Sequence, residues 1–370
     1  MSEETLQYFY DARSSNSFDQ HQQVSFIEDQ ATGLTAFIAI HNTNLGPAVG
    51  GCRMFNYADS NAALEDVLRL SRGMTYKSAL AGLPMGGGKS VIIGNPESQK
   101  SEQLMLAMGR FINAHQGAYV SAEDSGMGVS DLKTISRETQ HVLGIEDQQA
   151  FGGDPSPLTA RGIFRSMQAA AQFKYGDTSL RGCQVAIQGV GSVGRYLSKL
   201  LIDSGAEVWA ADTNSANLKA AIELGAQALD PAEIHKAAVD IFAPCAMGAV
   251  LNDATIPELN CSMIVGGANN QLAKSYHAKV LASRGVVYAP DFVVNAGGII
   301  EIYRQFKNIS EQESLFRIDA IADTLKTVLE QAEEQGLDTA TTAENLAESI
   351  FLSSNGNEST AQVENVGCAA

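Results

Sequence analysis

The sequence predicts an α/β protein of two domains, the second built on a doubly wound parallel sheet. A chain of 370 residues exceeds the usual size of one domain, and a hydrophobic content of 45% can fill two cores. From about residue 183, short apolar runs alternate with helical segments, which is typical of a parallel sheet with crossover helices. A glycine-rich turn at residues 189–194 separates the first of these runs from its helix.

The first 140 residues mix strand-like runs with amphipathic helices. Turn formers at Gln30–Gly33 separate two apolar runs and predict a hairpin. Residues 61–80 read as a helix, which Asp59 or Ser60 could cap and which delivers Lys77 near its end. Its apolar face consists of Leu64, Val67, Leu68 and Met74. Further strands are expected at Ser90–Ile93 and at Ala118–Ser121, just before Glu123 and Asp124.

The second half supplies the parallel sheet. Its strands are expected at Val185–Ile187, Val208–Ala211, Ile241–Ala243, Met263–Val265 and Val286–Tyr288. A linker rich in turn formers is expected at 152–157, and one long helix at about 311–335.

Composition excludes several classes of function. A net charge of -17 argues against nucleic acid or an anionic membrane as a partner, because both require a basic surface. We expect no membrane span and, from the polar start of the chain, no signal peptide. The five cysteines are scattered without a Cys-x-x-Cys pair and the histidines form no His-x-x-x-His pair, so we expect a reducing cytoplasm and no metal site.

The glycine-rich turn is a candidate dinucleotide site. It comprises Gly189, Val190, Gly191, Ser192, Val193 and Gly194. A strand precedes it, a helix follows it, and Asp212 ends the next strand, where an acidic side chain can accept hydrogen bonds from a ribose 2′-hydroxyl. Asp212 would repel a 2′-phosphate and no arginine follows Thr213, so NAD is favoured over NADP. The alternative is a βα turn that binds nothing.

Two lysines twelve residues apart form the second candidate site. Lys77 and Lys89 lie among apolar residues, and Gly86-Gly-Gly88 precedes Lys89 directly. An enclosed lysine loses hydration, which lowers its pKa towards general-base chemistry. A phosphate-binding P-loop is excluded, because that pattern needs a glycine where Leu83 stands and a strand before it. The alternative is two ordinary surface lysines.

Polar residues at strand ends complete the candidate site. Asp124 follows a strand, although it could instead cap a helix that begins near Ser130. Asn269, Asn270 and Asn295 follow parallel strands, where ligands bind, although asparagine is also common in turns. Together the two candidate sites indicate a redox enzyme that holds a small anionic substrate with lysines and transfers a hydride to a nicotinamide.

These segments together resemble the glutamate/leucine/phenylalanine/valine dehydrogenase family, and most closely its leucine dehydrogenase branch. The matching segments run in the family's order over roughly residues 35–305: Leu45–Arg53, Gly73–Lys77, Gly86–Lys89, Ala122–Asp124, Gln188–Gly191, Gly267–Gln271 and Tyr288–Gly298. The resemblance implies oxidative deamination of an L-amino acid to a 2-oxo acid, with release of ammonium and reduction of NAD.

The resemblance also implies roles for individual residues. Lys77, with Asn270 nearby, would bind the substrate α-carboxylate. Lys89 would be a general base of low pKa that activates water, and Asp124 would exchange protons with the amino group. Thr159 and Asn295 would face the nicotinamide, and the cofactor site would further include Thr213, Ala246 and Asn269.

The side-chain pocket is expected to be apolar. Glutamate dehydrogenases carry a lysine where this chain has Val49, so an acidic substrate would lose its countercharge in a dry pocket. The pocket would be formed by Val49, Gly50, Met74, Ile299 and Ile302. It favours a branched aliphatic or an aromatic substrate without deciding between them. Leu143 replaces the usual threonine of the leucine branch. Glu301 is expected to face solvent, and the alternative is that it points inward and accepts a polar or cationic group.

The domains follow from these sites. We expect a substrate-binding and oligomerisation domain at 1–148, a Rossmann dinucleotide-binding domain at 149–329, a helix at about 330–352 that packs back on the first domain, and a mobile tail at 353–370. A homo-oligomer of two to eight subunits is expected. The rival functions are a catalytically silent NAD(H)-binding regulator and a glutamate dehydrogenase, against which Val49 argues.

Overall fold

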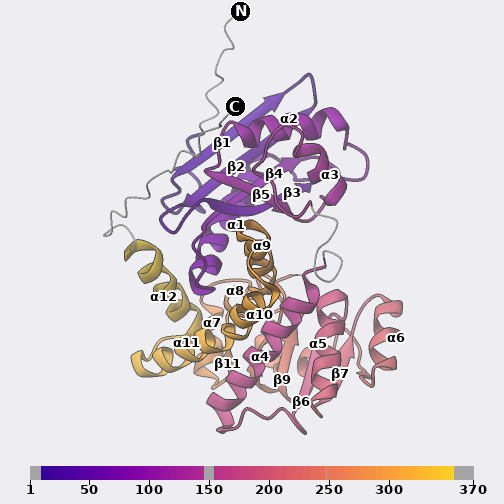
Figure 1. Ribbon diagram of the computed structural model, residues 1–370. Helices are drawn as coiled ribbons and strands as arrows, with labels where there is room; N and C mark the ends of the chain where they lie inside the picture. Colours follow the sequence, from indigo (N-terminus) through magenta and orange to yellow (C-terminus); the bar gives the residue numbers. More distant parts are fainter. Residues whose placement is uncertain (1–9, 146–153, 247, 354–370) are drawn as a thin grey trace, which may run out of the picture.

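The computed structural model describes residues 10–145, 154–246 and 248–353, which form two helix-covered sheets (Figure 1). The first sheet has the order β1-β2-β4-β3-β5, with bounds Gln23–Asp29, Leu34–Asn42, Ala48–Phe55, Gly86–Ile93 and Tyr119–Glu123 in chain order. The β1–β2 pair is antiparallel, which confirms the predicted hairpin, and β3 pairs in parallel with β4 and β5. Helices α1 (Ser60–Leu80), α2 (Glu102–Asn113) and α3 (Val129–Ile135) complete this part of the chain.

Helix α1 packs against β4 at very short range. The Asp59 side chain accepts a hydrogen bond from the Ala62 amide and caps the helix, as one of the two predicted caps. Strand β4 begins at Gly86, four residues earlier than predicted. At Gly87 a Cβ atom would lie 2.1 Å from the Thr75 amide nitrogen, so only glycine permits this approach of strand and helix. The glycines therefore belong to the strand and not to a preceding turn.

The second sheet is parallel throughout, with the order β11-β10-β9-β6-β7-β8. Its strands are Gln184–Gln188 (β6), Glu207–Ala211 (β7), Gln227–Ala228 (β8), Val239–Pro244 (β9), Cys261–Ile264 (β10) and Val287–Tyr288 (β11). The helices are α4 (Ser156–Tyr175), α5 (Ser192–Asp203), α6 (Ser215–Glu223), α7 (His277–Ser283), α8 (Asp291–Val294) and α9 (Gly297–Lys307). The strand order reverses at β6, which confirms the doubly wound fold and marks the expected ligand crevice.

The predicted helix over 311–335 is wrong in one respect, because it is two helices. Helix α10 (Glu311–Asp319) ends and α11 (Ile321–Gln335) begins at Ala320. The Arg161 guanidinium of α4 holds Asp319 through two hydrogen bonds of 2.7 Å just before the break. The division lets α10 pack on α9 as well as α4, while α11 packs on α4 and α12.

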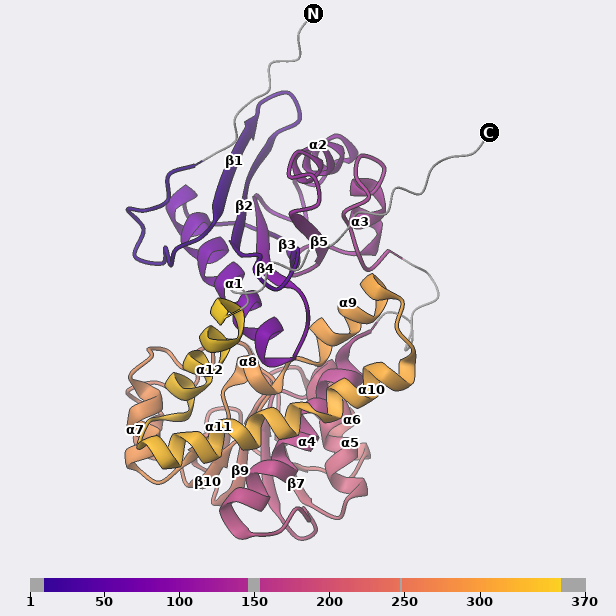
Figure 2. The same ribbon diagram turned by 60° about the vertical axis from the view of Figure 1, so that its left-hand side comes forward.

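Helix α12 (Thr339–Ser353) returns to the first sheet and packs on α1 (Figure 2). The Tyr76 hydroxyl donates a hydrogen bond of 2.7 Å to Glu348, and the Asn44 side-chain amide donates one of 3.0 Å to the Phe351 carbonyl. Arg72 stacks on the Tyr76 ring and pairs with Asp19 and Glu344.

The predicted linker and tail fall wholly or partly outside the described residues, whereas membrane spans, disulfides and metal sites can be assessed within them. The predicted linker lies partly in 146–153 and the predicted tail almost wholly in 354–370, both outside the described ranges. Within those ranges no helix is long and apolar enough to cross a membrane. The four cysteines of the described part are free thiols, and no group of acidic, histidine or cysteine side chains there could hold a metal ion.

The contact between β4 and α1 makes a prediction about stability. Gly87→Ala should lower the free energy of unfolding by about 3 kcal/mol, since the new methyl group meets backbone atoms that cannot move aside. Gly73→Ala in α1 is the matched control, because a Cβ there meets nothing within 4 Å and alanine favours a helix. Urea unfolding of both variants checks this, and equal stability of the two would contradict the packing argument.

Candidate active site

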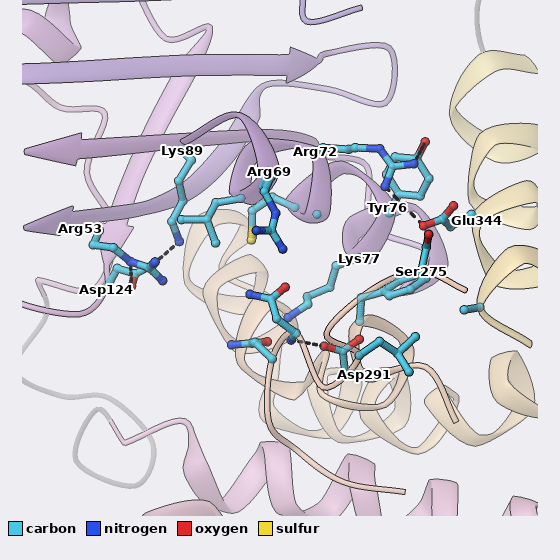
Figure 3. A pocket seen from close by; sticks show the side chains of 18 of the residues that line it. Arg53, Arg69, Arg72, Tyr76, Lys77, Lys89, Asp124, Ser275, Asp291 and Glu344 are labelled. Carbon is cyan, nitrogen blue, oxygen red and sulfur yellow. Dashed lines mark hydrogen bonds and ion pairs between the residues drawn. The ribbon is translucent and has the colours of Figure 1, made fainter. Parts of the chain in front are cut away.

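A cavity of about 420 Å³ lies between the two halves of the molecule (Figure 3). Helix α1, β4 and the end of β5 line one side, and the segments after β10 and β11 line the other, with α12 at one end. Six of the predicted site residues line it together: Met74, Lys77, Lys89, Asp124, Asn269 and Asn270. Residues from far apart in the sequence therefore form one site.

Lys89 and Asp124 form an ion pair at one end of this cavity. Lys89 is 5% exposed in β4, and its ammonium contacts the Asp124 carboxylate directly. Arg53 of β3 donates to the other Asp124 oxygen at 3.2 Å and to Asp66 at 2.8 Å. Burial alone would raise the pKa of Asp124, but Lys89 and Arg53 lower that pKa to about 2. Asp124 is thus a stable anion of the cavity and does not cap α3.

Lys77 projects from the last turns of α1 towards the segment that carries Asp291 (Figure 3). Burial lowers the pKa of Lys77 to about 8, with a further lowering by Lys89, while Asp291 and Asp124 act in the opposite direction. Asn270 lies in the same wall of the cavity in the left-handed backbone conformation, with φ of 54°. Its amide donates a hydrogen bond to the Asp291 carboxylate.

The predicted apolar pocket residues gather beside the cavity, although most of them do not line it. Val49, Ile299 and Ile302 belong to one hydrophobic cluster, against which Met74 and Leu143 also pack. Only Met74 reaches the cavity itself. Gly50 serves close packing between strands, because a Cβ there would collide with the Gly88 carbonyl oxygen. Met74 is thus the point at which this apolar cluster adjoins the cavity.

Glu301 does not face solvent, so that prediction is wrong. It is 6% exposed, and the guanidinium of Arg304 binds its carboxylate at 2.6–2.9 Å one turn later on α9. Burial of the carboxylate is tolerated because its charge is paired within the same helix. Glu301 does not line the cavity described above.

The glycine turn after β6 has the geometry that a dinucleotide requires. Gly189 has φ of 90°, a Cβ on Gly194 would lie 2.1 Å from the Gly189 oxygen, and one on Gly191 would meet nothing within 4 Å. The turn is thus tight, α5 packs closely on the sheet, and space remains at Gly191 where α5 begins. Asp212, at the end of β7, accepts the Val190 amide at 2.9 Å and so lies beside the turn.

The other predicted cofactor residues lie around this turn and beside the segment after β10. A Cβ on Gly189 would lie 2.6 Å from the Ala246 amide, and one on Gly267 would lie 3.2 Å from the Val193 side chain. The side-chain amide of Asn295 donates hydrogen bonds to the Asn269 side chain at 2.7 Å and to the Gly267 carbonyl at 3.2 Å. Its buried side-chain oxygen has no partner within the described residues. Thr159 is half-buried near Gly298, and Thr213 is exposed. An unpaired buried acceptor fits an amide donor of a ligand.

Several cavity residues were not assigned roles from the sequence. They are Arg53, Arg69, Arg72, Tyr76, Tyr288, Asp291 and Glu344. Asp291 could have been found, because it lies three residues after β11 within a segment that resembles the family. Arg72 and Glu344 could not, since their proximity depends on the return of α12 to α1.

Comparison with known proteins places the chain in a family. Residues 19–141 match the domain described as Glu/Leu/Phe/Val dehydrogenase, dimerisation domain, and residues 154–229 and 213–357 match Glutamate/Leucine/Phenylalanine/Valine dehydrogenase. A leucine dehydrogenase of Bacillus cereus is 45% identical over 92% of this chain and 93% of its own length. A phenylalanine dehydrogenase of Thermoactinomyces intermedius is 43% identical over 88% and 90%, respectively.

A solved structure agrees with these matches. The crystal structure of L-tryptophan dehydrogenase from Nostoc punctiforme superposes with a TM-score of 0.80 at 40% identity, covering 91% of this chain and 97% of that one. The two matched family domains correspond to the two sheets described above, and the fold is shared with this solved structure. The chain therefore belongs to the glutamate/leucine/phenylalanine/valine dehydrogenase family.

Proposed function

We propose that the protein catalyses the NAD-dependent oxidative deamination of an apolar L-amino acid to its 2-oxo acid, with water consumed and ammonium released. The observation that carries this proposal is the single cavity lined by Lys77, Lys89, Asp124 and Asn270. Two cations and one carboxylate match the carboxylate and ammonium groups of an amino acid.

Each polar group has a task in this reaction. Lys77 and Asn270 hold the substrate α-carboxylate, and Asp124, an anion with a pKa of about 2, attracts the substrate ammonium. Lys89 lies against Asp124 and, once it has lost its own proton to solvent at alkaline pH, takes the proton from the water that attacks the imino carbon. Asp124 remains an anion throughout, so Lys89 is the proton acceptor at this end of the cavity.

The glycine turn, Asp212 and Asn295 would hold NAD across the crevice of the second sheet. When bound, NAD accepts the hydride from the substrate Cα. The turn and the start of α5 offer amides to the pyrophosphate, Asp212 accepts from the ribose, and the unpaired oxygen of Asn295 accepts from the carboxamide. Residues 1–148 would then bind substrate and 149–329 the cofactor.

The apolar cluster favours an apolar side chain for the substrate. Val49, where glutamate dehydrogenases carry a lysine, is fully buried in an apolar cluster with Ile299, against which Ile302 packs. The named relatives act on leucine, phenylalanine or tryptophan, so the size of the side chain stays open.

We further propose a homo-oligomer, because the first matched segment is a dimerisation domain, and a cytoplasmic location, in keeping with the free thiols.

The first test is NAD reduction at 340 nm with leucine, valine, phenylalanine, tryptophan, glutamate and alanine in parallel at alkaline pH. Strong activity with an apolar amino acid and little with glutamate is expected, because a glutamate side chain would meet no countercharge. Tight NADH binding without turnover of any amino acid would instead favour the silent regulator.

Lys89→Ala should lower kcat by about a thousandfold or more and leave the Kd for NADH unchanged, since a general base is removed far from the glycine turn. The matched control is Lys199→Ala, which breaks an exposed lysine–aspartate pair on α5. Steady-state kinetics and NADH fluorescence titration check both variants. Turnover of Lys89→Ala at the wild-type rate would remove Lys89 from the base role.

Met74→Ala should lower kcat/KM for the preferred branched or aromatic substrate about tenfold, and that for alanine much less, because Met74 is the cluster residue that lines the cavity and apolar contact is lost only with a long side chain. The control is Leu200→Ala, a partly buried apolar residue of α5 in the second half of the chain. An unchanged ratio of the two kcat/KM values in Met74→Ala would place the substrate side chain elsewhere.

A further inference from the structure

The charges that line the cavity are unevenly paired. Its basic side chains are Arg53, Arg69, Arg72, Lys77 and Lys89. Arg53 and Lys89 share Asp124, and Arg72 pairs with Asp19 and Glu344, all within 4 Å. Lys77 and Arg69 make no such ion pair with any described residue. Lys77 and Asp291 line the two facing sides of the cavity, one from each half of the molecule (Figure 3), and Asp291 is the carboxylate with the largest electrostatic effect on Lys77.

Asp291 has a structural task that does not need its charge. Its carboxylate accepts the amide of Asn270, which holds that residue in its left-handed conformation, and its carbonyl accepts the Asn295 amide at the end of α8. A neutral asparagine could accept the same amide hydrogen. The negative charge thus requires a different explanation.

The charge has an evident disadvantage in this position. Burial raises the pKa of Asp291, against the opposing effect of Lys77, so the surroundings disfavour the anion. An anion in this wall also repels an anionic substrate. Lys77 is the group that gains from it, because burial and Lys89 both disfavour the ammonium form of Lys77 and Asp291 favours it.

We propose that Asp291 is the resident counter-ion of Lys77, a positioning residue that keeps Lys77 protonated and directed across the cleft before the substrate carboxylate arrives. The role of Lys77 towards a carboxylate rests on the function proposed above, whereas the pairing with Asp291 does not. The negative charge of Asp291, on the second half of the molecule, thereby keeps Lys77, on the first half, ready to bind a carboxylate.

The groups that face this pair are few. Lys77 of α1 is faced by Asp291 at the start of α8, by Lys89 of β4 and by Asp124 after β5. Asp291 is faced by Lys77 and by the Tyr288 hydroxyl of β11, whose pKa is raised far above its usual range by burial and by Asp291 itself. Of these four charged residues, Lys89 and Asp124 neutralise each other in a direct ion pair. Lys77 and Asp291 make no direct ion pair with any described residue.

The test removes the charge and keeps the acceptor, in Asp291→Asn. The pKa of Lys77 is measured in the substrate-free protein by pH-dependent amine labelling followed by mass spectrometry. We expect a midpoint of about 8 in the wild type and one about one unit lower in Asp291→Asn, because an attractive charge is lost. Asp291→Glu, which retains the charge, should return the midpoint towards the wild-type value.

A second readout reports binding. The Ki of 4-methylpentanoate, an unreactive carboxylate, is measured from pH 6 to 10 with the amino acid substrate. Only protonated Lys77 holds the carboxylate, so Ki rises above the pKa of Lys77, and a pKa lower by one unit raises Ki at pH 9 about tenfold. At pH 6 the two proteins should agree within about twofold.

The control is Asp230→Asn, which removes the same charge from an exposed aspartate that also accepts a backbone amide in the second half of the chain. It should change neither readout. An unshifted Lys77 midpoint in Asp291→Asn, or a Ki that rises equally at every pH, would overturn the counter-ion and leave only the anchoring of Asn270. If the midpoint shifts but 4-methylpentanoate inhibits neither protein, the counter-ion stands and the proposed carboxylate role of Lys77 falls.

Asp291→Ser covers the case in which Asp291→Asn does not fold, because serine also offers an oxygen to the Asn270 amide without a charge. The same lowered midpoint is expected, and an unchanged one overturns the proposal.

Discussion

The close approach of α1 to β4 is the constraint on which the site depends. Glycine at position 87 lets the strand lie against the helix backbone at Thr75. Lys77 lies on the helix two residues after this contact, and Lys89 lies on the strand two residues after Gly87. The side chains of both lysines therefore reach the same cavity. A larger residue at Gly87 would separate the two elements and with them the two ammonium groups. Packing inside the first half of the chain therefore fixes the spacing of these two lysines in the cavity.

The charged side chains that line the cavity are balanced in two different ways. Two basic groups converge on Asp124, which makes that carboxylate a permanent anion, while Lys77 is left with a partner on the other half of the molecule. The first arrangement is complete within one half of the chain. The second is complete only when both halves are in place, so the charge of Lys77 is balanced by the fold as a whole.

Much of this could be predicted from the sequence, because the strongest signals are local. The glycine turn with Asp212, the capped helix α1 and the alternation of strands and helices in the second half each depend on short segments. Glu301 was misplaced because a charged residue on a helix is expected in water, although Arg304 at i+3 was a signal of pairing. The partner of Asp291 could not be predicted, since it depends on how two distant segments meet across the cavity.

The return of α12 to α1 has a mechanical consequence. The chain passes from the first half to the second between α3 and α4, and it comes back through α12, which is fixed by Tyr76–Glu348 and Asn44–Phe351. Helix α12 is therefore tied to both halves of the molecule. Any opening of the cavity must either carry α12 along with α1 or break the Tyr76–Glu348 and Asn44–Phe351 hydrogen bonds.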